Sequence, residues 1–109
     1  MYTNCNQIFR LTVPAVRIAV ARELSSRYGR DQSSIASSLG IAQAAVSKYL
    51  HESYSPEVRR LVGLISAKGL ERRVVSAIVG RKGHEAVTAE IDSLASSGYV
   101  VREAMKMVH

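Results

Sequence analysis

The polar side chains best suited to specific recognition lie close together in residues 43–48. Gln43, Ala44 and Ser47 are spaced by one and three residues, so they share one face of a helix, with Lys48 beside them. The Gln43 amide can make a two-point hydrogen bond to adenine N6 and N7, whereas Ala44 can offer only a methyl to thymine. Lys48 and Ser47 suit phosphate better than a base edge. The segment therefore indicates contact with a nucleic acid; the alternative for Gln43 is a solvated polar residue.

The residues around this face have the pattern that a helix-turn-helix requires. Two short helices that cross steeply need a small residue where they touch, and Ala36 is small. The turn between them needs a residue that adopts positive φ, and Gly40 follows four residues later. Asp31 can cap the first helix, because its carboxylate can accept from N–H groups of the first turn. Four aliphatic residues fall where the helices would face a core: Ile35, Leu39, Ile41 and Val46. We expect a helix-turn-helix over Gln32–Leu50; the alternative is an ordinary helical hairpin.

The segment resembles the helix-turn-helix of phage-repressor-like (XRE-type) regulators. The longer stretch 5–50 resembles a set of archaeal transcriptional regulators with a Cys near the start, an opening like Thr12-Val13-Pro14-Ala15, and a motif matched here by Gly-Ile-Ala-Gln-Ala-Ala-Val-Ser-Lys-Tyr-Leu at residues 40–50. The resemblance covers the first half of the chain, and the second half only in helical character. It implies a recognition helix at about residues 42–50 in the major groove. It also implies that Gln32, which opens the first helix of the motif, braces the DNA backbone and Gln43.

One position departs from that motif. Ala42 stands where these regulators usually have Ser or Thr to cap the recognition helix. An alanine has no side-chain oxygen to accept from the first-turn N–H groups, so we expect this helix start to lack about 1 kcal/mol of capping.

The remaining sequence predicts the helices that must position this motif. Glycines and prolines divide the chain into helical segments at about residues 13–28, 32–39, 42–52, 56–68, 70–81 and 85–97. Pro14 suits the first turn of the first helix, and Ser55-Pro56 is a typical helix start. Along the first helix, one apolar face comprises Val13, Val16, Val20, Leu24 and Tyr28. Ile18 lies off that face, so the helix should bury more than one side. Tyr49, like Tyr28, is expected to pack in the core.

The tail at residues 99–109 is ambiguous. Tyr99–Arg102 has strand propensity and could form the wing of a winged-helix variant, whereas Glu103–Val108 could be helical. We expect an all-α fold: a repressor-like five-helix domain with at least one additional C-terminal helix. Residues 1–55 would hold the helix-turn-helix core. Residues 56–109 would complete that core and form the surface of a homodimer, because regulators of this class usually pair about a two-fold axis.

Charge favours a polyanionic partner. The chain carries a net charge of +6, with a pI near 9.9, which suits DNA, RNA or an anionic membrane. Residues 59–82 hold seven basic residues and one acidic residue, Glu71. This run is either a solvated face or a surface that contacts phosphates, with Arg59 and Arg60 nearest the recognition helix in sequence. There is no apolar run of about 18 residues and no signal peptide, so we expect a cytoplasmic protein without a membrane partner.

Other chemistries lack their residue patterns. Cys5 and the three histidines have no metal-ligand spacing, and Gly80-Arg81-Lys82-Gly83 lacks the strand that precedes a phosphate-binding loop. No catalytic arrangement is present, so we expect no enzyme activity, no metal and no cofactor. The expected function is that of a sequence-specific, double-stranded DNA-binding transcriptional regulator. The alternatives are a basic helical RNA- or ribosome-associated protein, and a protein-interaction module on a helix-turn-helix scaffold.

Overall fold

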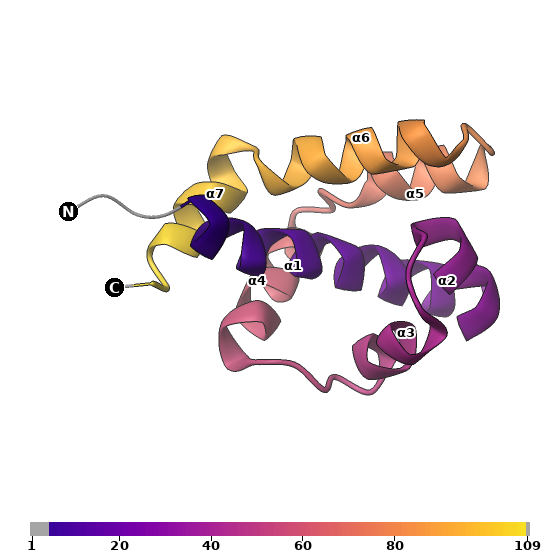
Figure 1. Cartoon of the computed structure of the whole chain (residues 1–109), viewed down its shortest axis with the longest axis horizontal. Helices are drawn as coiled ribbons and strands as arrows, with labels where there is room; N and C mark the ends of the chain where they lie inside the picture. Colours follow the sequence, from indigo (N-terminus) through magenta and orange to yellow (C-terminus); the bar gives the residue numbers. More distant parts are fainter. Residues whose placement is uncertain (1–4, 109) are drawn as a thin grey trace.

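Helix α1 (Cys5–Ser26) is the element around which the other helices pack. The computed structural model describes residues 5–108, with the Cys5 side chain left out, and this part of the chain is all-α and contains no strand. Figure 1 shows α1 along the long axis, with α5 and α6 on one side and α3 on the other. The other helices are α2 (Gln32–Leu39), α3 (Gln43–Leu50), α4 (Pro56–Ala67), α5 (Arg72–Val79), α6 (His84–Ala95) and α7 (Gly98–Met105). Residues 1–4 and His109 lie outside the described part of the chain.

Helix α1 is buried on more than one side, as the position of Ile18 predicts. Ile18, Val16 and Leu24 are all at most 1% exposed, and α1 contacts each of the other six helices. A helix at the surface of a globular protein would bury only one apolar stripe. The multiple alanines in α1 allow close approach by several neighbours at once, so α1 is the centre of a single core.

The start of α1 differs from the sequence expectation. The helix begins at Cys5 rather than near Val13, so Pro14 lies inside it instead of in the first turn. A proline there removes one backbone hydrogen bond. The extra turns bury Ile8 and Thr12 against the core, and this tertiary burial offsets the local penalty. The expectation for Tyr28 is also wrong: α1 ends at Ser26, and Tyr28 is 46% exposed.

The capping residues identified from sequence act as predicted. The Asp31 carboxylate accepts from the Ser34 backbone N–H at 2.8 Å, and the Ser55 hydroxyl accepts from the Val58 N–H at 3.3 Å. Both interactions satisfy N–H groups that a helix start leaves without an intrahelical partner. They set the beginnings of α2 and α4, which match the expected boundaries.

The tail is helical, so the wing-strand alternative is wrong. Gly98, which follows the helix expected at about residues 85–97, is the first residue of α7. Within α7, Val100 and Ala104 are fully buried, and the helix contacts α1, α4 and α6. A strand here would have no neighbouring strand among the described residues to pair its backbone N–H and C=O groups. A helix satisfies those groups internally and still buries the apolar side chains.

The apolar stripes of the C-terminal helices are buried within the chain itself. Leu61, Ile65, Val74 and Ile91 are all at most 4% exposed. The apolar surface of residues 56–109, part of which the sequence assigns to a homodimer interface, is therefore largely used in the chain's own core. None of the described helices is long and apolar enough to cross a membrane.

Candidate nucleic-acid interface

Helices α2 and α3 are joined by a tight turn at Gly40. Gly40 has φ 67° and ψ 35°, the left-handed conformation expected from sequence, and the Ile41 N–H donates back to the Ala36 carbonyl at 3.1 Å. Ala36 is 6% exposed. Such a hydrogen bond across a left-handed residue closes a helix C-terminus. The turn thus lets the chain change direction over the three residues 40–42 and start α3 against α2.

The apolar residues of this pair point to the core. Ile35 and Val46 are fully buried, and Leu39 is 5% exposed. Ile41 and Tyr49 are partly buried against the same core. These residues form the core-facing sides of both helices. The remaining side chains of α3 are therefore directed outward.

Three of the four candidate side chains on α3 are exposed. Gln43, Ala44 and Lys48 are exposed and Ser47 is half-buried. Ser47 also contacts a neighbour: the His51 ring Nδ1 lies 2.7 Å from the Ser47 carbonyl oxygen and 3.4 Å from its hydroxyl. His51 thereby satisfies a carbonyl at the end of α3. The face available to a ligand is formed mainly by Gln43, Ala44 and Lys48.

The start of α3 lacks a side-chain cap. Ala42 occupies the N-cap position with φ −69° and ψ 146°, and makes no side-chain hydrogen bond. This confirms the predicted departure from the motif. Gln32, at the first position of α2, is half-buried. Within residues 5–108, no hydrogen bond joins Gln32 to Gln43.

Arg59 and Arg60 differ in their surroundings. The Arg59 guanidinium lies 3.7 Å from Glu52 Oε1, donates to the Glu52 carbonyl at 3.2 Å, and stacks over the Tyr54 ring at 5.7 Å. Arg59 therefore holds the loop between α3 and α4. Arg60 is exposed and makes no side-chain interaction within the described part of the chain. Of the two, Arg60 is the freer to contact an anion.

The basic run at residues 59–82 does not form one face. Arg73 lies 3.5 Å from Glu90 on α6, and Lys68 stacks over the Tyr99 ring at 4.6 Å. Glu71, the acidic residue of the run, is 5% exposed, and its Oε1 atom has no hydrogen-bond partner in the described structure. Burial raises the pKa of the Glu71 carboxyl, because a buried carboxylate loses its hydration.

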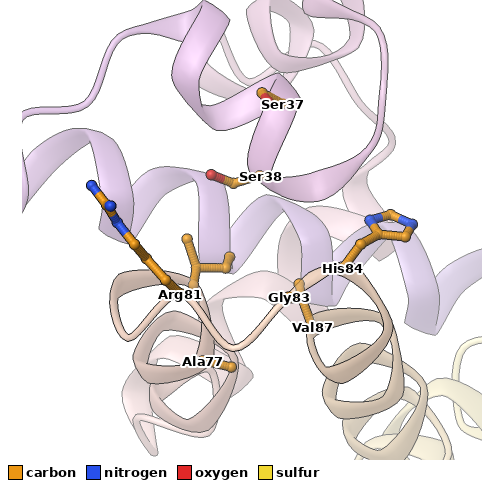
Figure 2. Close-up of a pocket in the computed structure, with 8 residues that line it drawn as sticks. Ser37, Ser38, Ala77, Arg81, Gly83, His84 and Val87 are labelled. Atoms are coloured by element: carbon orange, nitrogen blue, oxygen red, sulfur yellow. The ribbon is translucent and has the colours of Figure 1, made fainter.

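The far end of this run lies against α2. The loop between α5 and α6 carries Arg81 and Lys82, and His84, the first residue of α6, packs on Gly40. A Cβ built on Gly40 would lie 2.6 Å from His84 Cε1. In Figure 2, Arg81 from this loop and His84 from the start of α6 lie on either side of Ser38 of α2. Between them is a hollow of about 180 Å³.

The sequence gives no indication that Ser37, Ser38 and His84 line a hollow together. The sequence of residues 80–83 lacks the strand that precedes a phosphate-binding loop, and in the structure the loop follows helix α5. The available signal was the pair of glycines, Gly80 and Gly83, around two adjacent cations. Nothing in the sequence places that loop beside Gly40, because the contact depends on how α5 and α6 pack on α1.

Comparisons of the chain with family models, with curated proteins and with solved structures found no match. Among the described residues, no group of three or more His, Cys, Asp or Glu side chains could hold a metal ion.

Proposed function

We propose that α2 and α3 form a repressor-like helix-turn-helix and that the protein is a sequence-specific, double-stranded DNA-binding transcriptional regulator. The observation that carries the proposal is the turn at Gly40. Its left-handed conformation, with the small Ala36 beside it and Val46 fully buried, leaves one short helix with an exposed polar face. That is the arrangement by which a helix-turn-helix presents its second helix to the major groove.

Each side chain of that face has a distinct role in the proposal. Gln43, at the first position of α3, lies where recognition helices contact base edges, and its amide suits adenine. Ala44 leaves room for a thymine methyl. Lys48, one turn further along, contacts a phosphate, with Ser47 as a weaker contributor. Gln32 and Arg60 add phosphate contacts from the neighbouring helices, and Arg59 contributes through the loop that it holds.

The overall charge supports binding to a polyanion. A net charge of +6 attracts DNA irrespective of sequence, and the counterions released on binding make the affinity depend on salt. One short recognition helix reads only a few base pairs, so we also propose that two copies bind together about a two-fold axis.

In vitro selection from random DNA duplexes with the full chain tests this function. We expect an enriched palindrome whose half-sites are separated by about one helical turn, roughly 34 Å. A parallel selection from an RNA pool serves as the comparison. Enrichment from RNA alone, or no enrichment from duplex DNA, contradicts the proposal; a single half-site contradicts the paired arrangement only.

A further inference from the structure

We propose that the hollow between α2 and the loop at residues 80–83 is a binding site for a phosphate group. The side chains with polar groups that line it come from two separate parts of the chain: Ser37 and Ser38 from α2, and Arg81 and His84 from the α5–α6 connection. Figure 2 shows Ser38 between Arg81 and His84, with Ser37 set further back on α2. The site lies apart from the exposed face of α3. The existence of the site does not depend on the proposed function; only the idea that its ligand is a DNA phosphate rests on that function.

The Ser38 hydroxyl can donate a hydrogen bond to a ligand. Arg30 Nη1 donates to Ser38 Oγ at 3.3 Å. Since that oxygen already accepts a hydrogen bond, the Ser38 O–H is available as a donor to a ligand. The Arg30 interaction also places a second guanidinium beside the hollow. Phosphate oxygens accept hydrogen bonds and carry negative charge, so this combination of hydroxyls and guanidinium groups matches their chemistry.

The cations at this site are not neutralised by the protein. Within residues 5–108, the Arg81 side chain makes no ion pair or hydrogen bond, and the lining residues include no carboxylate. Elsewhere in the same basic run, Arg59 and Arg73 are each paired with a glutamate. Arg81, like Arg60, therefore carries a charge that no carboxylate among the described residues offsets, and beside the hollow this charge favours an anionic occupant.

The backbone adds donors to the same opening. Helix α6 is twelve residues long and begins at the rim, with Gly83 as its N-cap and no side chain capping its first turn. The N–H groups of such a first turn have no intrahelical partner and attract anions. These N–H groups supplement the hydrogen-bond donors and the positive charge of the side chains.

The position of the hollow beside the α2–α3 turn suggests two sources for the phosphate. His84 packs on Gly40, three residues before Gln43. A phosphate in the hollow would therefore lie near His84 and the Gly40 turn that precedes α3. It could belong to the DNA backbone or to a soluble phosphorylated molecule. Both offer the same oxygens, and experiment can separate them.

The test uses inorganic phosphate as the probe and the full chain. Phosphate is titrated at constant ionic strength, with chloride as the balancing anion, while backbone amide resonances are recorded by NMR. We expect saturable shifts at Ser37, Ser38 and residues 81–84. The Arg81→Gln variant should bind phosphate about tenfold more weakly, because it loses a charge-assisted hydrogen bond.

The matched control is Arg102→Gln. Arg102 is an exposed arginine on α7, and Figure 1 shows α7 at the opposite end of α1 from α2. This variant removes the same charge and should bind phosphate like the native chain. Ser38→Ala provides a second variant of the site, and thermal melting of each variant verifies folding. Absent or non-saturable shifts, or equal losses in Arg81→Gln and Arg102→Gln, overturn the proposal.

Salt dependence of duplex binding identifies the source. If the DNA backbone fills the hollow, Arg81→Gln should lower the slope of log K against log salt by about one unit, and Arg102→Gln should not. If a soluble phosphate fills it, Arg81→Gln loses phosphate binding with an unchanged slope. Phosphate binding without any duplex binding refutes the proposed function and supports the site. Duplex binding without phosphate shifts and without a slope change refutes the site alone.

Discussion

Helices α2 and α3 have equal lengths but are held in place differently. Helix α2 begins with a capped turn at Asp31 and buries Ile35, Ala36 and Leu39. Helix α3 begins at Ala42 without a side-chain cap and fully buries only Val46. Short helices derive most of their stability from packing and caps rather than from intrinsic propensity, so α2 is much the better anchored of the two.

The difference indicates that α2 serves mainly for stability and the outer face of α3 mainly for binding. The residues of α2 stabilise the core, and its C-terminal turn determines where α3 starts. The residues of α3 that would have increased its burial are instead polar or small and face outward: Gln43, Ala44 and Lys48. Substitutions in the turn and in α2 should therefore change the free energy of unfolding, whereas those on the outer face of α3 should change binding.

The largest effect is expected at the turn itself. Gly40→Ala should lower the free energy of unfolding by about 2 kcal/mol, because alanine is strained at φ 67° and its Cβ would meet the His84 ring. Gly29→Ala is the matched control: Gly29 has φ 64° but open space around its Cβ position. Urea denaturation of both variants separates backbone strain from the His84 contact. Equal losses at the two positions would show that the His84 contact adds nothing.

The next effect concerns binding rather than stability. Gln43→Ala should weaken binding to the selected duplex by about 1–3 kcal/mol and relax the preference at one base position. Lys48→Ala should weaken binding to all duplexes about equally, because phosphate contacts carry no sequence information. Binding isotherms on matched and mismatched duplexes measure both. An unchanged selected motif in the Gln43 variant contradicts the assignment of α3 as the recognition helix.

A smaller loss is expected at the cap of α2. Asp31→Ala removes the acceptor of the Ser34 N–H and should lower the free energy of unfolding by about 1 kcal/mol. Asp31→Asn retains an oxygen acceptor at the cap and serves as the control. Thermal unfolding compares them; similar melting temperatures for Asp31→Ala and the native chain would show that the cap is not needed to anchor α2.

The smallest effect should be a gain at the start of α3. Ala42→Ser supplies the missing side-chain acceptor and should raise the free energy of unfolding by about 0.5–1 kcal/mol. The N-cap geometry of Ala42, with extended φ and ψ, suits a serine without rearrangement. The thermal melting of Ala42→Ser, with Ala42→Gly as the comparison, tests this. A decrease for serine would mean that the helix starts at a different residue.

Local signals in the sequence predict much of the fold and of the α2–α3 pair. The caps at Asp31 and Ser55, the left-handed Gly40 and the uncapped Ala42 depend on interactions within a few residues. Such short-range geometry is encoded by residue type and spacing. The exposure of Gln43 and Lys48 follows in turn from the apolar residues on the opposite side of α3.

The sequence by itself determined where the short helices begin and end, and which of their faces point to the core or to solvent. Only the tertiary structure decided that α1 continues through Pro14 and that residues 98–105 are helical. It also decided that Arg59 pairs with Glu52, whereas Arg81 makes no ion pair within residues 5–108. It also brought His84 onto Gly40, more than forty residues away in the chain. For the two helices the physical reason is that burial against α1 outweighs a local preference of about 1–3 kcal/mol. For the side-chain contacts it is the packing of whole helices, which brings together residues that are distant in sequence.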